Sequence, residues 1–384
     1  MRKIALSLLA VSLVGGCGGS SDPSPSDLPF PASTVTKLDK AIQEAMASVD
    51  CPGAVVGLWI PGEGSYVVTK GVRDKVTKEP MRLDDHFRIG SNTKAFVGTV
   101  ILQMVDEGLI TLDQKVSTII ENVPNGDKIS IRNLLNMTSG LVNYSELKVM
   151  ENWLWYDHQS MLTTKNLLNF AFESEHPIEF QPGEEYSYSN TNTVLLGEII
   201  RIKTGKSPAQ AFQERIFARL GMAQTSWPTT NALPTPHPRG YTDDTPDKSV
   251  VDATDYSPSW TDAAGQLVSD LQDMKVWAKS MGTGSLISPK MQTERLKWVT
   301  APGAPQYYGL AIGKSGGWLH HQGELPGFNT IACYLPQKDA VMVVLCTSNV
   351  PVGEPGPAAR VCKAVSDVVT PQYSPGTTLP DDEN

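Results

Sequence analysis

Residues 87–96 read Phe-Arg-Ile-Gly-Ser-Asn-Thr-Lys-Ala-Phe, a short run that places a serine at the start of a predicted helix. Ser91 and Lys94 are three positions apart, so on a helix that begins at Ser91 their side chains share one face. We interpret Ser91 as a nucleophile and Lys94 as its base, because a serine hydroxyl attacks only once another group takes its proton.

Lys94 can act as a base only if its surroundings lower its pKa. A free lysine amine has a pKa of about 10.4 and is charged at neutral pH. A helix N-terminus contributes only about 0.3 to 1 kcal/mol, whereas burial can lower a lysine pKa by about 3 to 5. Burial must therefore be the main cause of a lowered Lys94 pKa. Apolar residues at three- and four-residue intervals predict a buried helix that stops near Gly108: Phe96, Val97, Val100, Ile101, Met104, Val105 and Leu109.

The Ser-x-x-Lys pattern is weak evidence by itself, because the chain contains it twice. The second copy, Ser145 to Lys148, lies in polar surroundings with no apolar run before it, and we interpret it as exposed surface. Even for Ser91 the alternative is a helix N-cap serine followed by a surface lysine. Other parts of the chain must decide between these interpretations.

Composition limits the classes of function. The chain has 384 residues, of which 40% are hydrophobic, and this is enough for a large core. Its formal net charge of −9 gives no basic surface for nucleic acid, so we expect no nucleic-acid partner.

The N-terminus predicts export. Arg2 and Lys3 precede an apolar run at residues 4–14 that is too short to span a bilayer, which is typical of a signal peptide. The run ends in Leu-Val-Gly-Gly-Cys, which resembles a bacterial lipobox, so we expect residues 1–17 to be a lipoprotein signal with Cys17 as the lipidated residue. Residues 18–32 are a Pro/Ser linker. We therefore expect a domain anchored by lipid to a membrane of the bacterial cell envelope, or a secreted one if Cys17 is not lipidated.

The order of predicted elements indicates an α+β fold. A helix and a hairpin come first, a helical block occupies roughly residues 90–300, and strands and a final helix follow. The expected elements are a helix at 35–49, strands at 54–60, 66–71, 308–312, 318–321, 330–335 and 340–347, and a helix at 358–369. We predict an antiparallel sheet built from both ends of the chain and flanked by helices, an all-helical lobe, a catalytic domain at 33–368 and a polar tail at 369–384.

A cleft between the sheet and the helical lobe is the expected place for a site. Tyr188-Ser189-Asn190 is the only Tyr-x-Asn in the chain. A phenol beside Lys94 can pass a proton, and the amide of Asn190 can bind substrate. The alternative is a turn with a structural tyrosine.

Three motifs in this order resemble the serine D-alanyl-D-alanine carboxypeptidase and class C β-lactamase family. They are Ser91-x-x-Lys94, Tyr188-x-Asn190 and His321-Gln322-Gly323. Flanking stretches at 134–141, 181–183, 217–222 and 263–269 also resemble that family, and the likeness covers roughly residues 35 to 368. It implies a penicillin-binding fold and an exported serine hydrolase.

The resemblance also implies roles for these residues. Ser91 would be acylated, and Lys94 and Tyr188 would transfer protons. His321 would supply an electrostatic or proton-relaying group, and Asn190, Gln322, Gly323 and Glu324 would bind substrate. Backbone N–H groups of Ser91 and Glu324 would form the oxyanion hole.

Two departures from the family pattern bear on the substrate. Many relatives have threonine where Gln322 stands, and hydroxyls there help to bind a terminal carboxylate. Glu324 adds a negative charge beside that position, which would repel a carboxylate if the side chain points inward. Our main expectation from the resemblance is a D-alanyl-D-alanine carboxypeptidase-like or β-lactamase-like hydrolase. The two departures favour the first alternative, a carboxylesterase or amidase for neutral or cationic substrates. The second alternative is a non-catalytic cell-wall-binding or sensor protein. The substrate would be a peptide, a β-lactam or an ester.

Two other strings compete for the third motif. Lys203-Thr204-Gly205 follows the Tyr188 helix and is interpreted as a helix end. Lys314-Ser315-Gly316 is interpreted as a turn between two late strands, pointing away from the cleft.

Four cysteines remain after Cys17. A hairpin that turns at residues 336–339 would place Cys333 opposite residue 342 or so, which argues against a bond between Cys333 and Cys346. Cys51 with Cys362 is the candidate pair. His320, His321 and Glu324 lack metal-ligand spacing, so we expect no metal and no cofactor, and we expect a monomer.

Overall fold

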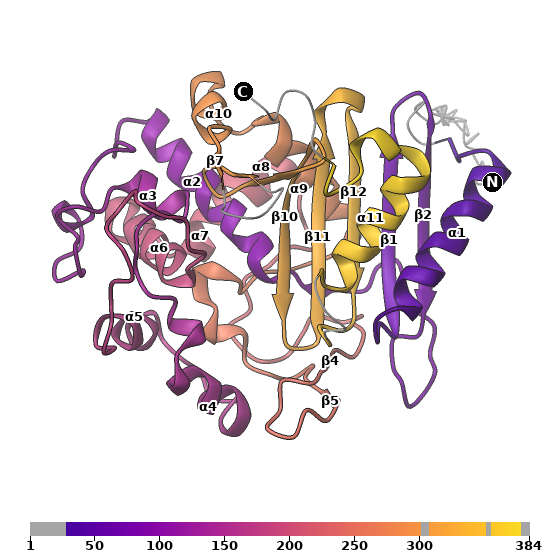
Figure 1. Ribbon diagram of the computed structural model, residues 1–384, viewed down its shortest axis with the longest axis horizontal. Coiled ribbons are helices and arrows are strands. Elements are labelled where there is room, and N and C mark those ends of the chain that lie inside the picture. The colour runs from indigo at the N-terminus through magenta and orange to yellow at the C-terminus, as the bar shows by residue number, and fades with distance from the viewer. Residues whose placement is uncertain (1–27, 301–306, 351–354, 378–384) are drawn as a thin grey trace, which may run out of the picture.

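Figure 1 shows the computed structural model, which describes residues 28–300, 307–350 and 355–377. A large antiparallel sheet with helices on both of its faces lies beside a lobe made mainly of helices. The predicted α+β fold class is confirmed.

The sheet joins the two ends of the chain. Its strands are β1 (Gly53–Ile60), β2 (Gly64–Gly71), β7 (Val299–Thr300), β8 (Tyr307–Tyr308), β9 (Gly313–Ser315), β10 (Trp318–Leu325), β11 (Phe328–Leu335) and β12 (Ala340–Cys346). They form one eight-stranded sheet in the order β2-β1-β12-β11-β10-β9-β8-β7. The N-terminal hairpin borders the last strand, because β1 pairs antiparallel with β12, with Ala54 opposite Cys346.

Both faces of the central strands are buried, which explains their continuous apolar runs. Helices α1 (Ala32–Ala47) and α11 (Pro357–Val369) cover one face, where Val56 belongs to their apolar cluster. Val55, the next residue along β1, joins the opposite cluster with α9 (Leu271–Thr283).

The helical lobe surrounds α2 (Thr93–Asp106), the helix that follows Ser91. Every residue of α2 from Thr93 to Met104 is buried, and Phe96 stacks on Trp277 of α9 with ring centroids 3.6 Å apart. The predicted buried helix is thus confirmed, although it ends before Leu109, which is 45% exposed. The lobe also contains α3 (Ile131–Leu135), α4 (Lys148–Tyr156), α5 (Thr164–Phe172), α6 (Asn190–Thr204), α7 (Pro208–Phe212), α8 (Ala218–Leu220) and α10 (Pro289–Arg295).

Two short strand pairs complete the lobe. Strand β3 (Phe87–Arg88), which comes shortly before Ser91 in the chain, pairs antiparallel with β6 (Val268–Ser269). Strand β4 (Tyr241–Thr242) pairs with β5 (Val251–Asp252).

The late strands differ from prediction in more than one place. The predicted strand at 308–312 is wrong, because the chain leaves β8 after Tyr308 and loops back. Ala311 has φ +56°, and the N–H of Leu310 donates to the carbonyl of Arg295. These residues are apolar because the loop is buried, and burial alone does not specify a strand. By contrast, β10 runs beyond the predicted end at 321 to Leu325.

The folded region extends beyond the predicted domain at both ends. Phe30 is buried, and the N–H of Ser65 donates to the carbonyl of Leu28, so residues 28–32 of the predicted linker pack on the domain. At the other end, the N–H of Gly376 donates to Ser315 Oγ over 3.1 Å, so part of the predicted polar tail packs as well.

The cysteines pair differently from the expected arrangement. Cys333 lies opposite Met342, as the hairpin predicted. The Cys51–Cys362 pair is wrong: Cys51 contacts Cys346, and Cys362 Sγ lies 3.7 Å from Cys333 Sγ. The reason is that β1 borders β12, whereas α11 places Cys362 over β11.

Candidate active site

Ser91 lies in a tight turn between β3 and α2. The turn is a 3-10 helix, Gly90–Asn92, in which Gly90 has φ +51°, a backbone conformation that favours glycine. The buried Asn92 side chain fixes the turn, because its Nδ2 donates to the Ile89 carbonyl over 3.1 Å and to Thr330 Oγ1 of β11 over 3.0 Å. The serine is therefore held against the sheet by a local turn and a distant strand.

Lys94 reaches Ser91 from the first turn of α2. Its Nζ donates to Ser91 Oγ over 2.8 Å and to the carbonyl of Ala264 over 2.8 Å. The side chain is completely buried. Burial holds the pKa of Lys94 well below its ordinary value. An uncharged amine of this kind can accept the proton of Ser91.

Tyr188 contacts both Ser91 and Lys94. Its phenol and the Ser91 hydroxyl are hydrogen-bonded, and Lys94 Nζ lies 4.9 Å from the centroid of its ring. Burial raises the pKa of Tyr188 well above the ordinary value, and the bond from Ser91 lowers it only in part. Tyr188 is therefore protonated at neutral pH. The structure brings Ser91, Lys94 and Tyr188 together, as the sequence analysis expected.

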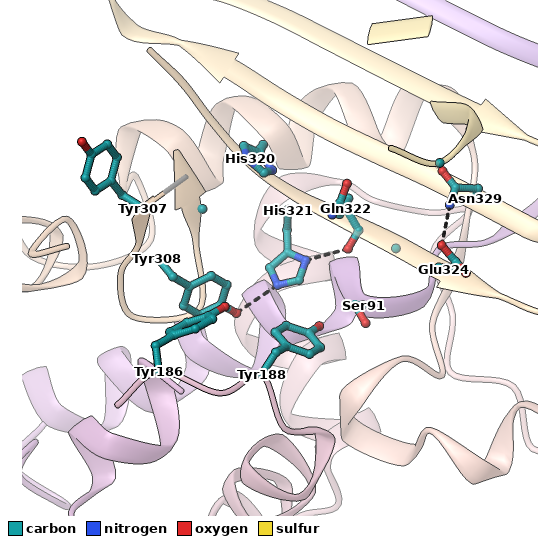
Figure 2. A pocket seen from close by; sticks show the side chains of 13 residues that line it. Ser91, Tyr186, Tyr188, Tyr307, Tyr308, His320, His321, Gln322, Glu324 and Asn329 are labelled. Carbon is teal, nitrogen blue, oxygen red and sulfur yellow. Dashed lines mark hydrogen bonds between the residues drawn. The ribbon is translucent and has the colours of Figure 1, made fainter. Parts of the chain in front are cut away.

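His321 is held in a fixed orientation next to these groups (Figure 2). Its Nδ1 donates to the Gln322 carbonyl over 2.7 Å, which leaves Nε2 to accept from the Tyr308 hydroxyl over 3.1 Å. Burial, assisted by the nearby Lys94, lowers the pKa of His321 to about 3. The imidazole is therefore neutral, and both of its nitrogens are engaged.

The edge of β10 closes the site opposite α2. Strand β9 pairs with β10 from Trp318 to His320, and beyond His320 this edge lies against the turn that carries Ser91. The fit is close at two glycines. A Cβ at Gly323 would lie 1.9 Å from the Ile89 carbonyl oxygen, and a Cβ at Gly90 would lie 2.7 Å from Glu324 N. The backbone N–H of Glu324 is thus placed next to the Ser91 turn.

Glu324 is exposed, and a neighbouring strand orients it. Its carboxylate accepts a hydrogen bond from Asn329 Nδ2 over 3.0 Å. The other amide atom of Asn329, Oδ1, accepts from the N–H of Ala358 in the first turn of α11 over 2.9 Å. Gln322 is exposed on the same strand.

These residues line one cavity of about 380 Å³. Its walls are Ser91, Tyr186, Tyr188, Tyr307, Tyr308, Gly313, His320, His321, Gln322, Gly323, Glu324, Asn329 and Gly356. Among these described residues Glu324 is the only carboxylate, and none is a lysine or an arginine. The two histidines are neutral as well, since burial lowers the pKa of His320 to about 4 and that of His321 to about 3. Within the described lining, the carboxylate of Glu324 is therefore the charged group.

The aromatic wall of this cavity was not predicted from the sequence. Tyr308 contacts both Tyr186 and Tyr188, with ring centroids 5.8 Å and 6.3 Å away. Tyr186 was detectable, because residues two apart in an extended segment point to the same side, and Tyr188 was already a candidate. Tyr307 and Tyr308 gave no such signal, since their short strand is positioned by its neighbours.

Asn190 does not line the cavity. Its Nδ2 donates to Ser145 Oγ over 2.9 Å, and its backbone N–H donates to Asn143 Oδ1 over 3.0 Å. The structure therefore places Asn190 at the start of α6, bonded to the segment before α4.

The two strings that competed for the third motif, residues 203–205 and 314–316, are not among the residues that line this cavity, although Gly313, which precedes the second string, is. Lys203 and Thr204 end α6, and Gly205 adopts φ +71°, as expected for a helix end. Lys314 and Ser315 were expected in a turn, but they belong to β9 and pair with β10.

The predicted lipidation site, Cys17, lies outside the described residues. Within the described ranges, no helix combines the length and the apolar character needed to cross a membrane. No group of three or more His, Cys, Asp or Glu side chains in the same ranges is arranged to hold a metal ion.

Two solved structures resemble this chain over most of its length. The first is a D-stereospecific amidohydrolase from a Streptomyces species, with 27% identity and a TM-score of 0.77, covering 88% of this chain and 98% of that one. The second is the D-amino acid amidase of Ochrobactrum anthropi SV3 in complex with L-phenylalanine amide, with 26% identity and a TM-score of 0.76 at the same coverages.

The chain also resembles curated proteins in sequence. The protein flp of Staphylococcus aureus (strain N315) is 26% identical over 336 residues, or 82% of this chain. The chain spans only 62% to 63% of the length of the curated relatives it matches first. The family model described as Beta-lactamase matches residues 38–364, and the chain therefore belongs to the Beta-lactamase family.

Proposed function

We propose that this chain hydrolyses amide bonds through an acyl-enzyme on Ser91, with amides of D-amino acids as the favoured substrate class. This choice of substrate class rests on the charge of the residues that line the cavity. Glu324 is the charged side chain of the described lining, and its carboxylate would repel a substrate that ends in a carboxylate. An amide that bears a neutral or cationic group meets no such repulsion. The two structural relatives named for D-stereospecific and D-amino acid amide chemistry support the same class.

The proposed chemistry begins with the proton of Ser91. The neutral Lys94 amine, 2.8 Å from Ser91 Oγ, takes that proton as Oγ bonds to the substrate carbonyl carbon. Tyr188 is bonded to Ser91 and protonated, so it donates its proton to the leaving nitrogen and regains one from Lys94. The C–N bond breaks and an amine leaves. Water then attacks the acyl group by the reverse route and frees Ser91 and the carboxylic acid.

The oxyanion of the tetrahedral intermediate would be bound by two backbone N–H groups, those of Ser91 and Glu324. The contact of the β10 edge with Gly90 supports this assignment. Each such donor is typically worth about 2.7 to 4 kcal/mol in the transition state. His321, held by Tyr308, would keep the wall beside Tyr188 neutral.

The other functions fit the cavity less well. A D-Ala-D-Ala carboxypeptidase or a β-lactamase must bind a substrate carboxylate, which the charge at Glu324 opposes. An esterase would use the same groups, because the acyl transfer differs only in the leaving atom. A non-catalytic binding protein gives no reason for a buried lysine amine in contact with a serine hydroxyl.

The test compares kcat/KM for D-phenylalanine amide, a short acyl ester and an acetylated peptide ending in D-Ala-D-Ala. We expect the amide to be the best substrate and the peptide the poorest. Glu324→Gln should lower kcat/KM for the cationic amide and raise it for the carboxylate peptide, each by about tenfold. Glu175→Gln is the control, because the Glu175 side chain is 90% exposed. A wild-type preference for the D-Ala-D-Ala peptide would contradict the proposal.

We also propose that the hydrolase acts outside the cytoplasm and is anchored through Cys17. The basis is the signal-like N-terminus described above. Mass spectrometry of the membrane fraction should find a diacylated Cys17 peptide, and a Cys17→Ser variant should lose it.

A further inference from the structure

The four described cysteines form two contacting pairs, and the proposed hydrolysis uses none of them. All four are buried in the apolar layer between the sheet and the helices α1 and α11. Because both pairs are buried on the same face of one sheet, we consider them together as sites of the same chemistry.

The first pair joins a strand to a helix. Cys333 of β11 and Cys362 of α11 have their sulfur atoms 3.7 Å apart. They are 29 residues apart in the sequence.

The second pair joins the segment before β1 to the end of β12. Cys51 and Cys346 are in hydrogen-bonding contact. Cys346 lies opposite Ala54 in the sheet, and Cys51 Sγ also donates to the Gly53 carbonyl over 3.4 Å. This pair links residues from opposite ends of the described chain.

We propose that each pair is a site of oxidative modification and forms a disulfide as the chain folds, Cys51 with Cys346 and Cys333 with Cys362. The oxidant is a disulfide compound such as oxidised glutathione or a protein disulfide of the cell envelope. One cysteine thiolate attacks the oxidant and releases one thiol. The second cysteine then attacks the mixed disulfide and releases the other thiol. Two electrons and two protons thus pass to the oxidant for each bond formed.

The sheet register prevents exchange between the pairs. Cys346 lies opposite Asn329 on β11, and Cys333 is four residues further along that strand. At about 3.3 Å per residue this is roughly 13 Å, well beyond the Cα separation of about 4.4 to 6.8 Å that a disulfide spans. The native fold therefore specifies one pairing. Burial raises the pKa of Cys333, and the hydrogen bond with Cys51, together with burial, raises that of Cys346, so the thiols react before the layer closes rather than after.

The Cys333–Cys362 bond would also support the cleft. Strand β11 carries both Cys333 and Asn329, and Asn329 connects Glu324 to the first turn of α11. A covalent link between β11 and α11 would keep these three parts in register.

The test begins with full-length protein that is reduced, unfolded and refolded in a glutathione redox buffer. It is then denatured, alkylated without reductant, digested and analysed by mass spectrometry. We expect one cross-linked peptide with Cys51 and Cys346 and another with Cys333 and Cys362, each two hydrogen masses below the sum of its thiol peptides. Alkylation of all four described cysteines, or a Cys51–Cys362 cross-link, would overturn the proposal.

Two further measurements follow, and the first uses the wild type alone, so it does not depend on a variant that could fail to fold. Reductant should lower the Tm of the refolded wild type by at least about 3 °C. Cys333→Ala should leave Cys362 open to alkylation while the Cys51–Cys346 cross-link persists. An unchanged wild-type Tm in reductant would count against the two bonds. None of these outcomes depends on which substrate the enzyme hydrolyses.

Discussion

Chemistry at Ser91 depends on which neighbour holds a proton. In water the amine of lysine and the phenol of tyrosine have similar pKa values, about 10.4 and about 10. Burial disfavours a charge on either group, so it lowers the pKa of Lys94 and raises that of Tyr188. The same apolar surroundings therefore make one group a base and keep the other an acid.

Lys94→Arg tests this division of roles. A guanidinium stays charged at every accessible pH, so it cannot take the serine proton, and we expect kcat to fall by about 10²- to 10⁴-fold. Wild-type activity should decline as the pH falls through the lowered pKa of Lys94, because protonation removes the base. The measurement is kcat against pH.

The matched control is Lys148→Arg. Lys148 belongs to the other Ser-x-x-Lys copy, its side chain is 70% exposed, and it pairs with Glu151. The Lys148→Arg variant should keep both the kcat and the pH profile of the wild type. A Lys94→Arg enzyme with the wild-type acid limb would refute the base assignment.

For single residues of the site, the sequence predicted contacts between residues that are close together in the chain. Ser91 and Lys94 are one helical turn apart, so spacing alone predicted their contact. Asn329 could not be found in this way, because it becomes part of the site only when β11, β10 and α11 meet.

At the scale of elements, the site is a contact between α2 and the edge of β10. Residues all around α2 are buried, so the helix is covered on every side and isolates Lys94 from water. The edge of β10 approaches the Ser91 turn closely only because Gly90 and Gly323 have no side chains.

Gly323→Ala should therefore damage the oxyanion hole. The new methyl group would overlap the Ile89 carbonyl and push β10 away from the turn. We expect kcat to fall about 10²- to 10³-fold, the loss seen when one oxyanion donor is removed. Steady-state kinetics and thermal unfolding of the same sample measure the two effects.

Gly62→Ala serves as the control for stability. Gly62 has φ +80° and open space around its Cα, so alanine there adds backbone strain of about 1 to 2 kcal/mol far from the cleft. The Gly62→Ala variant should therefore have a lower Tm than the wild type but the same kcat. If Gly323→Ala also keeps kcat, the proposed role of the β10 edge is wrong.

Element boundaries show where sequence patterns stop being informative. The hairpin of β1 and β2 and the helices α1, α2 and α11 were predicted closely, because each has a clear period and a turn or glycine near its end. Residues 308–312 have the apolar composition of a strand, yet Ala311 adopts φ +56° and the segment loops. Contacts with Arg295, far away in sequence, decide that conformation.

At the scale of the whole molecule, folding places two uncharged histidines in the cleft wall. Burial lowers the pKa of His320 to about 4 and that of His321 to about 3, against about 6.5 in an unfolded chain. Between these values the unfolded state binds more protons than the folded state. Stability should therefore be complete above about pH 6.5 and fall as the pH decreases through that window.

His320→Asn tests this linkage and leaves His321 in place. Within the described residues His320 Nδ1 has no hydrogen-bond partner, so the variant sacrifices little bonding. We expect the wild type to lose on the order of 1 to 2 kcal/mol per buried histidine between pH 7 and pH 5, and the variant to lose about half of the total. Urea unfolding at both pH values measures this, with His176→Asn, whose side chain is 85% exposed, as the control. Equal pH dependence in His320→Asn and wild type would contradict the expectation.

The order of elements along the chain predicted the architecture, because strands at both ends and helices between them can bury their faces in few ways. It did not predict the cysteine pairs, since those depend on α11 lying over β11 and on the position of the segment before β1. Nor did it predict the tyrosine wall, which forms only when β8 meets the segment before α6.

The most direct test of the central claim is intact-protein mass spectrometry after exposure to a fluorophosphonate and, separately, to a fluorescent penicillin. Wild type and Ser117→Ala should each gain one fluorophosphonate group, because Ser117 is exposed and is not among the residues that line the cavity, and Ser91→Ala should gain none. The penicillin, which carries a carboxylate, should label poorly. An unlabelled wild type, or a fluorophosphonate adduct that survives in Ser91→Ala, would contradict the assignment of Ser91 as the nucleophile.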